Sequence, residues 1–128
     1  MTRVLVVSHT HPRLTRGGAE IAAFEQFRRL REAPGVTAFF LAGNGGWHAR
    51  RAGVAIQRPW GPDEFLADTP GYDHFRHANP NPALAREWAA LLEELRPDII
   101  HFHHYLGFGV ELLAAARRHA PQARLVLT

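Results

Sequence analysis

Two glycines stand next to each other directly before a segment that is expected to form a helix. They are Gly17 and Gly18 in the stretch SHTHPRLTRGGAE, which runs from Ser8 to Glu20. Glycine amides at a helix N-terminus can approach an anion closely, and the helix dipole adds partial positive charge there. One interpretation of this pattern is a site for a diphosphate or a sugar phosphate. The alternative is that the pair only supplies a positive φ for a sharp entry into the helix.

Charged side chains flank the two glycines. Arg13 and Arg16 precede them, and the planar guanidinium group of arginine can bind two phosphate oxygens at once. Glu20 follows in the first turn of the expected helix. There it either complements the helix dipole or binds a hydroxyl group of a ligand. The candidate ligand-binding residues of this loop are Gly17, Gly18, Arg13, Arg16 and Glu20.

Histidines form a second group of candidates, because imidazole can bind a ligand, transfer a proton or hold a metal. Five histidines lie in SHTHP and in HFHHY, the latter spanning 101–105. One of them, His101, is interpreted as a hydrogen-bonded core residue. The residues expected to line a cleft are His9, His11, His103, His104 and Tyr105. A zinc site made only of histidines is the alternative. No carboxylate stands at a spacing such as H-E-x-x-H, so no metal ligand is assigned.

Apolar runs and helical periodicity predict the elements that position these residues. Strands are expected at 3–8, 36–42, 54–57, 99–103 and 123–128. Helices are expected at 19–32, from Pro82 to just before Pro97, and at 107–120. The segment of about 58–82 is expected to be an irregular insertion, with at most a short helical piece at Glu64–Ala67. Its aromatic residues either stack on a sugar-like ligand or pack the loop onto the domain.

The alternation of strands and helices predicts a doubly wound, Rossmann-like α/β fold with a parallel sheet in the order 3-2-1-4-5. In this order the first and fourth strands are neighbours. Sheets of this kind bind ligands in the crevice between the carboxyl ends of such strands. We therefore expect the loop after the first strand to meet the HFHH segment there.

The composition limits the classes of function. The chain has 128 residues, no cysteine and a formal net charge of +3. This length suits one domain, and the lack of cysteine excludes disulfides and thiolate metal ligands. All 15 basic residues are arginines, but they are scattered, so nucleic-acid binding is not indicated. The N-terminal apolar run is too short for a signal peptide or a transmembrane segment, and a cytoplasmic protein is expected.

Two long segments resemble the N-terminal domain of family-4-type glycosyltransferases with the GT-B fold. The first is RVLVVSHTHPRLTRGGAEIAAFEQFRRL, which resembles the first strand, the GG-x-E loop and the first helix of that domain. The second is LRPDIIHFHHYLGFGVELLAAARRHAPQARLVLT, which resembles the later PD-x-[IV]-H-x-H strand, helix and strand. The resemblance covers almost the whole chain except roughly 45–82.

The resemblance implies the acceptor-side part of a retaining glycosyltransferase. Such an enzyme moves a sugar from a nucleotide-sugar donor to a sugar or lipid-linked acceptor, with no cofactor or metal required. It implies that Gly17 and Gly18 approach the phosphates of the donor, that His103 and its neighbours line the cleft, and that His101 is the buried histidine of the motif. It assigns no catalytic residue in this part. A lipid acceptor would bring the protein to a membrane surface.

The family's C-terminal donor-binding domain is absent from these 128 residues. The chain therefore resembles a fragment whose sheet is incomplete at its C-terminal edge, and we expect it to be inactive by itself. Two other classes of protein stay open on the sequence alone. One is a stand-alone binding module for a phosphorylated or sugar ligand, and the other is a His-rich metal-binding domain.

Overall fold

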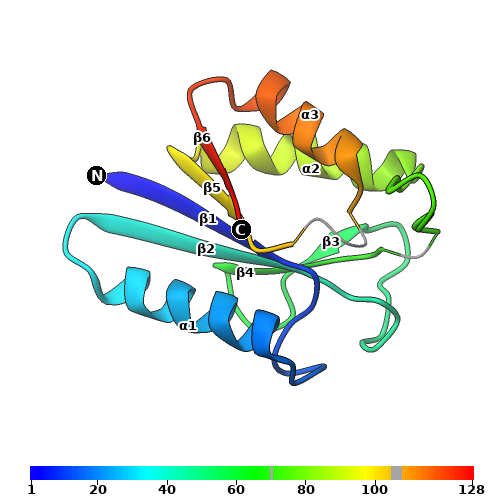
Figure 1. Cartoon of the computed structure of the whole chain (residues 1–128), viewed down its shortest axis with the longest axis horizontal. Helices are drawn as coiled ribbons and strands as arrows, with labels where there is room; N and C mark the ends of the chain where they lie inside the picture. The colour runs from blue at the N-terminus through cyan, green and yellow to red at the C-terminus, as the bar shows by residue number, and fades with distance from the viewer. Residues whose placement is uncertain (70, 105–107) are drawn as a thin grey trace.

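The structure is a computed structural model, and it describes residues 1–69, 71–104 and 108–128. In these residues six strands form one sheet, and helices cover both of its faces (Figure 1). The strands are β1 (Thr2–Ser8), β2 (Val36–Gly43), β3 (Ile56–Gln57), β4 (Glu64–Ala67), β5 (Ile99–Phe102) and β6 (Arg124–Leu127). The helices are α1 (Gly18–Glu32), α2 (Pro82–Leu95) and α3 (Val110–His119). Helix α1 lies on one face of the sheet, and α2 and α3 lie on the other.

The predicted doubly wound fold is confirmed, but the strand order differs slightly, because the unpredicted strand β4 lies between β2 and the predicted strand at 54–57. The sheet order is β3-β4-β2-β1-β5-β6. Every pair is parallel except β3 with β4. The five parallel strands lie in the order β4-β2-β1-β5-β6, so β4 takes the place beside β2 that was predicted for the strand at 54–57. Strands β1 and β5 are neighbours, as the functional interpretation requires.

The third parallel strand is β4, and the prediction of a helical piece at Glu64–Ala67 was wrong. Strand β4 pairs with β2, with Phe40 opposite Glu64, and all four of its residues are buried. A run of four residues is too short to show whether its apolar residues repeat with the period of a strand or of a helix. Burial on both faces is typical of a strand inside a parallel sheet. In the predicted strand 54–57 only Ile56 and Gln57 pair, and they do so antiparallel to β4. The insertion at about 58–82 thus contributes a strand to the sheet.

Helix α3 begins later than its periodicity predicted. Gly109 precedes its first residue and has φ of +92°, which lies outside the helical region. Val110 is therefore the first helical residue, and the predicted start at Gly107 lies outside the described residues.

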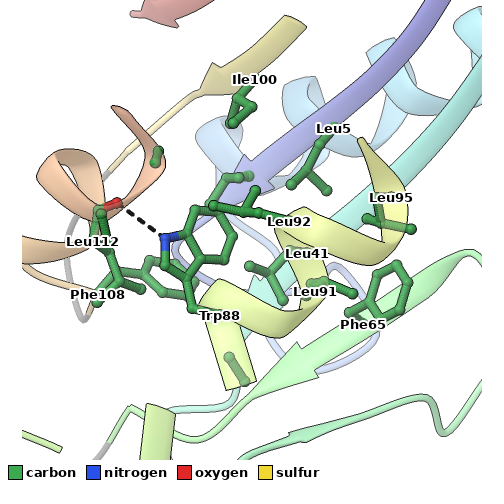
Figure 2. Packing of buried hydrophobic residues seen from close by; sticks show 14 of the residues in the cluster. Leu5, Leu41, Phe65, Trp88, Leu91, Leu92, Leu95, Ile100, Phe108 and Leu112 are labelled. Carbon is green, nitrogen blue, oxygen red and sulfur yellow. Dashed lines mark hydrogen bonds between the residues drawn. The ribbon is translucent and has the colours of Figure 1, made fainter. Parts of the chain in front are cut away.

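The core has two layers because successive residues of β1 point to opposite faces of the sheet. Val4 and Val6 pack under α1, whereas Leu5 and Val7 pack under α2 and α3. Trp88 of α2 is fully buried in the second layer. Figure 2 shows its indole ring among leucine and phenylalanine side chains from both helices and the sheet. Among the described residues, no helix is long and apolar enough to span a membrane.

Candidate functional site

The carboxyl ends of β1 and β5 lie side by side (Figure 1). Val7 pairs with Phe102, and the backbone N–H of His103 donates to the carbonyl of Val7 at 2.8 Å. Beyond the strand ends, the rings of His9 and His104 meet edge to face with 5.7 Å between their centroids. The two histidine-bearing stretches therefore meet in space, as the sequence predicted.

A pocket of about 430 Å³ lies at the carboxyl edge of the sheet, between the loop after β1 and the loops after β2 and β4. Its described lining residues are His9, Thr10, Thr15, Glu20, Gly45, Trp47, Thr69, Tyr72 and His74. We call this the Glu20 pocket. It combines hydroxyl groups, imidazoles, one carboxylate and two large aromatic rings, which is a lining suited to a polar organic molecule.

Glu20 occupies the N-terminus of α1 with its own carboxylate. Its side chain is 5% exposed and accepts a hydrogen bond of 2.5 Å from the Thr15 hydroxyl. The backbone N–H groups of Gly17 and Glu20 also donate to it, as in a capping box. Burial by itself raises the pKa of Glu20, but these hydrogen bonds outweigh burial and hold the pKa below its ordinary value. Glu20 is therefore ionised at neutral pH.

Gly17 and Gly18 have different surroundings. A Cβ atom on Gly17 would lie 2.5 Å from Oε1 of Glu20, whereas one on Gly18 would meet no heavy atom within 4 Å. Gly17 has φ of −110° and Gly18 is helical, so the alternative that the pair supplies a positive φ is wrong. Gly17 lacks a side chain because Glu20 packs against it. Of the two glycines, only Gly18 has open space at its Cβ position.

His9 faces Glu20 in the pocket. Its Nε2 lies 4.0 Å from Oε2 of Glu20, and its side chain is 27% exposed. Within the described part of the chain, its buried Nδ1 has no hydrogen-bond partner. Burial lowers the pKa of His9, the Glu20 charge opposes this, and His104 lowers the pKa further, so the net shift is downward. The site therefore pairs a neutral imidazole with an ionised carboxylate.

His11 is buried beneath the loop and does not line the Glu20 pocket, which corrects its predicted place in the cleft. Its Nδ1 accepts a hydrogen bond of 3.0 Å from the backbone N–H of Arg13. Its Nε2–H therefore donates to Oε1 of Glu64, at 2.9 Å. Glu64 belongs to β4, and because the sequence did not reveal β4, this buried partner could not be foreseen. The rings around His11 are those of Phe24, Phe40 and Trp60.

We expect the free energy of unfolding to fall as the pH is lowered through 6.5, the ordinary pKa of histidine. Burial lowers the pKa of folded His11, and Glu64 only partly offsets this. Below pH 6.5 the unfolded chain binds a proton that folded His11 does not bind, so acid favours unfolding until the folded pKa is passed. In urea unfolding between pH 8 and pH 5, the free energy of unfolding of His11→Gln should fall less steeply than that of the wild type. The matched control, His74→Gln at an exposed position, should keep the wild-type slope. An unchanged slope in His11→Gln would contradict the assignment.

His101 and His103 are joined to α1 by one glutamine. Their rings stack with 4.3 Å between centroids. Gln26 donates to Nδ1 of His101 at 3.0 Å and accepts from Nε2 of His103, and His101 donates from Nε2 to the Thr128 hydroxyl at 2.5 Å. Burial lowers the pKa of both rings, and His101 adds to the lowering at His103. His103 therefore contacts α1 instead of the Glu20 pocket, and Tyr105 lies outside the described residues.

The two candidate arginines lie outside the Glu20 pocket. Both are exposed, and the guanidinium group of Arg13 lies 5.4 Å from the ring centroid of Trp60. With Arg16 it borders a separate depression of about 360 Å³. No group of three possible metal ligands is found in the described ranges. The predicted phosphate ligands and the predicted hydroxyl ligand therefore belong to two different surfaces.

Three pocket residues were not predicted as a group: Trp47, Tyr72 and His74. Trp47 follows the glycine-rich turn after β2, and the other two lie in the insertion. The available signal was an aromatic residue just past the carboxyl end of a parallel strand, where such sheets bind ligands. The fold brings all three to the edge that carries Glu20.

Comparison with known families gives a match over most of the chain. The sequence model of Glycosyltransferase Family 4 matches residues 16–128. The chain belongs to glycosyltransferase family 4. The family 4 match spans the glycine pair, Glu20 and every element after β1, which supports a function of the glycosyltransferase type. No individual curated protein matches this family 4 chain significantly in sequence.

Proposed function

We propose that the Glu20 pocket binds the acceptor in a retaining transfer of a sugar from a nucleotide-sugar donor. The observation that carries the proposal is the ionised Glu20 carboxylate, 4.0 Å from neutral His9, at the ligand-binding edge of a family 4 domain. A carboxylate accepts hydrogen bonds from sugar hydroxyls, and an imidazole can accept or donate one. The proposed acceptor is a sugar or a lipid-linked molecule, and the proposed setting is cytoplasmic.

The donor would approach from the outer side of the helix end. Gly18 is exposed and leaves open space where a side chain would be, and Arg13 and Arg16 lie on the same loop. Backbone and guanidinium groups there would contact the donor's phosphates without a metal. The described residues form one sheet, whereas family members use a second domain for the nucleotide. These residues by themselves are therefore expected to bind ligands without transferring sugar.

Substitution of Gly18 by alanine should separate ligand binding from folding. Alanine is a better helix former than glycine, so Gly18→Ala should raise the free energy of unfolding by about 0.5 to 1 kcal/mol. The added methyl group points into the space proposed for the donor, so binding of UDP-glucose or GDP-mannose should weaken at least threefold. Isothermal titration and urea unfolding measure the two effects.

Gly35→Ala is the matched control. It also adds a methyl group into open space, but at the opposite end of α1. It should leave nucleotide-sugar binding unchanged and should destabilise the chain, because Gly35 has φ of +76°. Equal donor binding by Gly18→Ala and the wild type would remove Gly18 from the proposed donor site.

A further inference from the structure

We infer that the Glu20 pocket selects an acceptor group that carries no phosphate or carboxylate. The inference rests on the proposed function, because it names the class of acceptor that the same pocket takes. It follows from three features of the described lining: a buried negative charge, the lack of a compensating arginine, and an exposed aromatic rim.

The negative charge is fixed in place. Oε2 of Glu20 is held by the Thr15 hydroxyl, and the carboxylate also receives the backbone N–H groups of Gly17 and Glu20. These are the same amides that would bind a ligand anion at an open helix N-terminus. Because the protein's own carboxylate already uses them, these amides are not available to an anion in the pocket. On the side of the helix end that faces the pocket, the Glu20 carboxylate therefore repels phosphate.

No arginine in the described lining offsets this charge. Arg13 and Arg16 border the separate depression. Arg50 is paired with Asp68, and 3.4 Å separates its Nε from Oδ2 of that residue. The other polar groups of the pocket are hydroxyls of threonine and tyrosine and imidazoles of histidine. These groups bind a neutral hydroxyl as well as an anion. A phosphate or carboxylate in the pocket would meet like charge in a partly desolvated site, where charges act strongly.

The rim offers a flat apolar surface for a sugar ring. Trp47 is 68% exposed, and its ring lies over Gly45, where an added Cβ would be 3.5 Å from Cδ1 of the indole. The Tyr72 hydroxyl contacts Nδ1 of His77 at 3.2 Å, and its ring meets His74 edge to face at 4.9 Å. Exposed aromatic faces beside a carboxylate suit a pyranose, which has apolar C–H faces and a polar edge of hydroxyls.

The test compares matched sugars on the 128-residue chain by NMR titration of backbone amides. The probes are methyl glucoside, glucose 6-phosphate and glucuronate, together with mannose and mannose 6-phosphate. We expect the neutral sugars to shift the amides of Thr15, Glu20 and Thr69 and to bind at least tenfold more tightly than their anionic partners. Glu20→Gln should reduce this ratio below threefold, and Trp47→Ala should weaken all probes alike. Glu32→Gln, at the exposed far end of α1, should keep the wild-type ratio.

Titration of the wild-type chain alone distinguishes failure of the charge selection from failure of the proposed acceptor pocket, so the test does not depend on the variants folding. If phosphorylated sugars shift the pocket amides at equal or lower concentration than neutral sugars, the charge selection is wrong while the acceptor pocket stands. If no sugar of either kind shifts these amides, the proposed function of the pocket fails and the inference fails with it.

Discussion

Replacing Trp88 with alanine is expected to lower the free energy of unfolding by about 3 to 5 kcal/mol. The side chain is fully buried between α2, α3 and the sheet (Figure 2). Its indole N–H also donates to the carbonyl of Leu112 at 3.0 Å, which ties α2 to α3. Alanine would leave a large cavity and remove the hydrogen bond that joins the two helices. Urea unfolding followed by circular dichroism measures the change.

Two matched variants separate the causes. Trp88→Phe keeps most of the apolar volume but removes the donor to Leu112, so its cost should be smaller than that of the alanine variant. Trp47→Ala removes the same side chain from an exposed position and should cost less than about 1 kcal/mol. A loss below 2 kcal/mol in Trp88→Ala would show that this residue does not anchor the core.

Gly43→Ala is expected to disturb both stability and the pocket. An added Cβ atom would collide with the backbone carbonyl of His9 and would lie 3.3 Å from Cγ2 of Thr69. A backbone carbonyl cannot move as a flexible side chain can, so overpacking of this kind costs about 1 to 3 kcal/mol. Because His9 and Thr69 both line the pocket, sugar binding should weaken at least fivefold, and their amide resonances should shift.

Gly46→Ala is the comparison for this variant. The position lies in the same turn region, has φ of +89° and has open space where a Cβ atom would stand. Its free energy of unfolding should fall by about 1 kcal/mol, because alanine is strained in the left-handed backbone conformation. The amide resonance of His9 should not shift. If both variants behave alike, the close approach of Gly43 to His9 has no role in shaping the pocket.

The fold was predictable where the sequence pattern was long and regular. The apolar run of β1 and the periodic leucines of α2 identified their elements, and strand–helix alternation predicted a parallel sheet in which β1 and β5 are neighbours. Strand β4 was missed because four residues carry no period, and its pairing with β2 depends on contacts distant in sequence. The edge strand β3 exists only because β4 is there to pair with it.

The sequence predicted which segments lie next to each other at the site, but it did not predict which way their side chains point. Adjacency of β1 and β5 brought His9 and His104 together, as expected from the sheet order. His11 and His103 turned elsewhere because Glu64 and Gln26 offered them hydrogen bonds. Both partners are far away in sequence, so nothing near either histidine could reveal them.

The carboxylate of Glu20 serves two purposes with one group of atoms. It completes the first turn of α1 and it sets the electrical character of the neighbouring pocket. A substitution at Glu20 that changes the ligand preference of the pocket therefore also changes the capping of α1. A related protein that binds a charged substrate here would need another group to cap the first turn of α1. This requirement limits how the specificity of the domain can diverge.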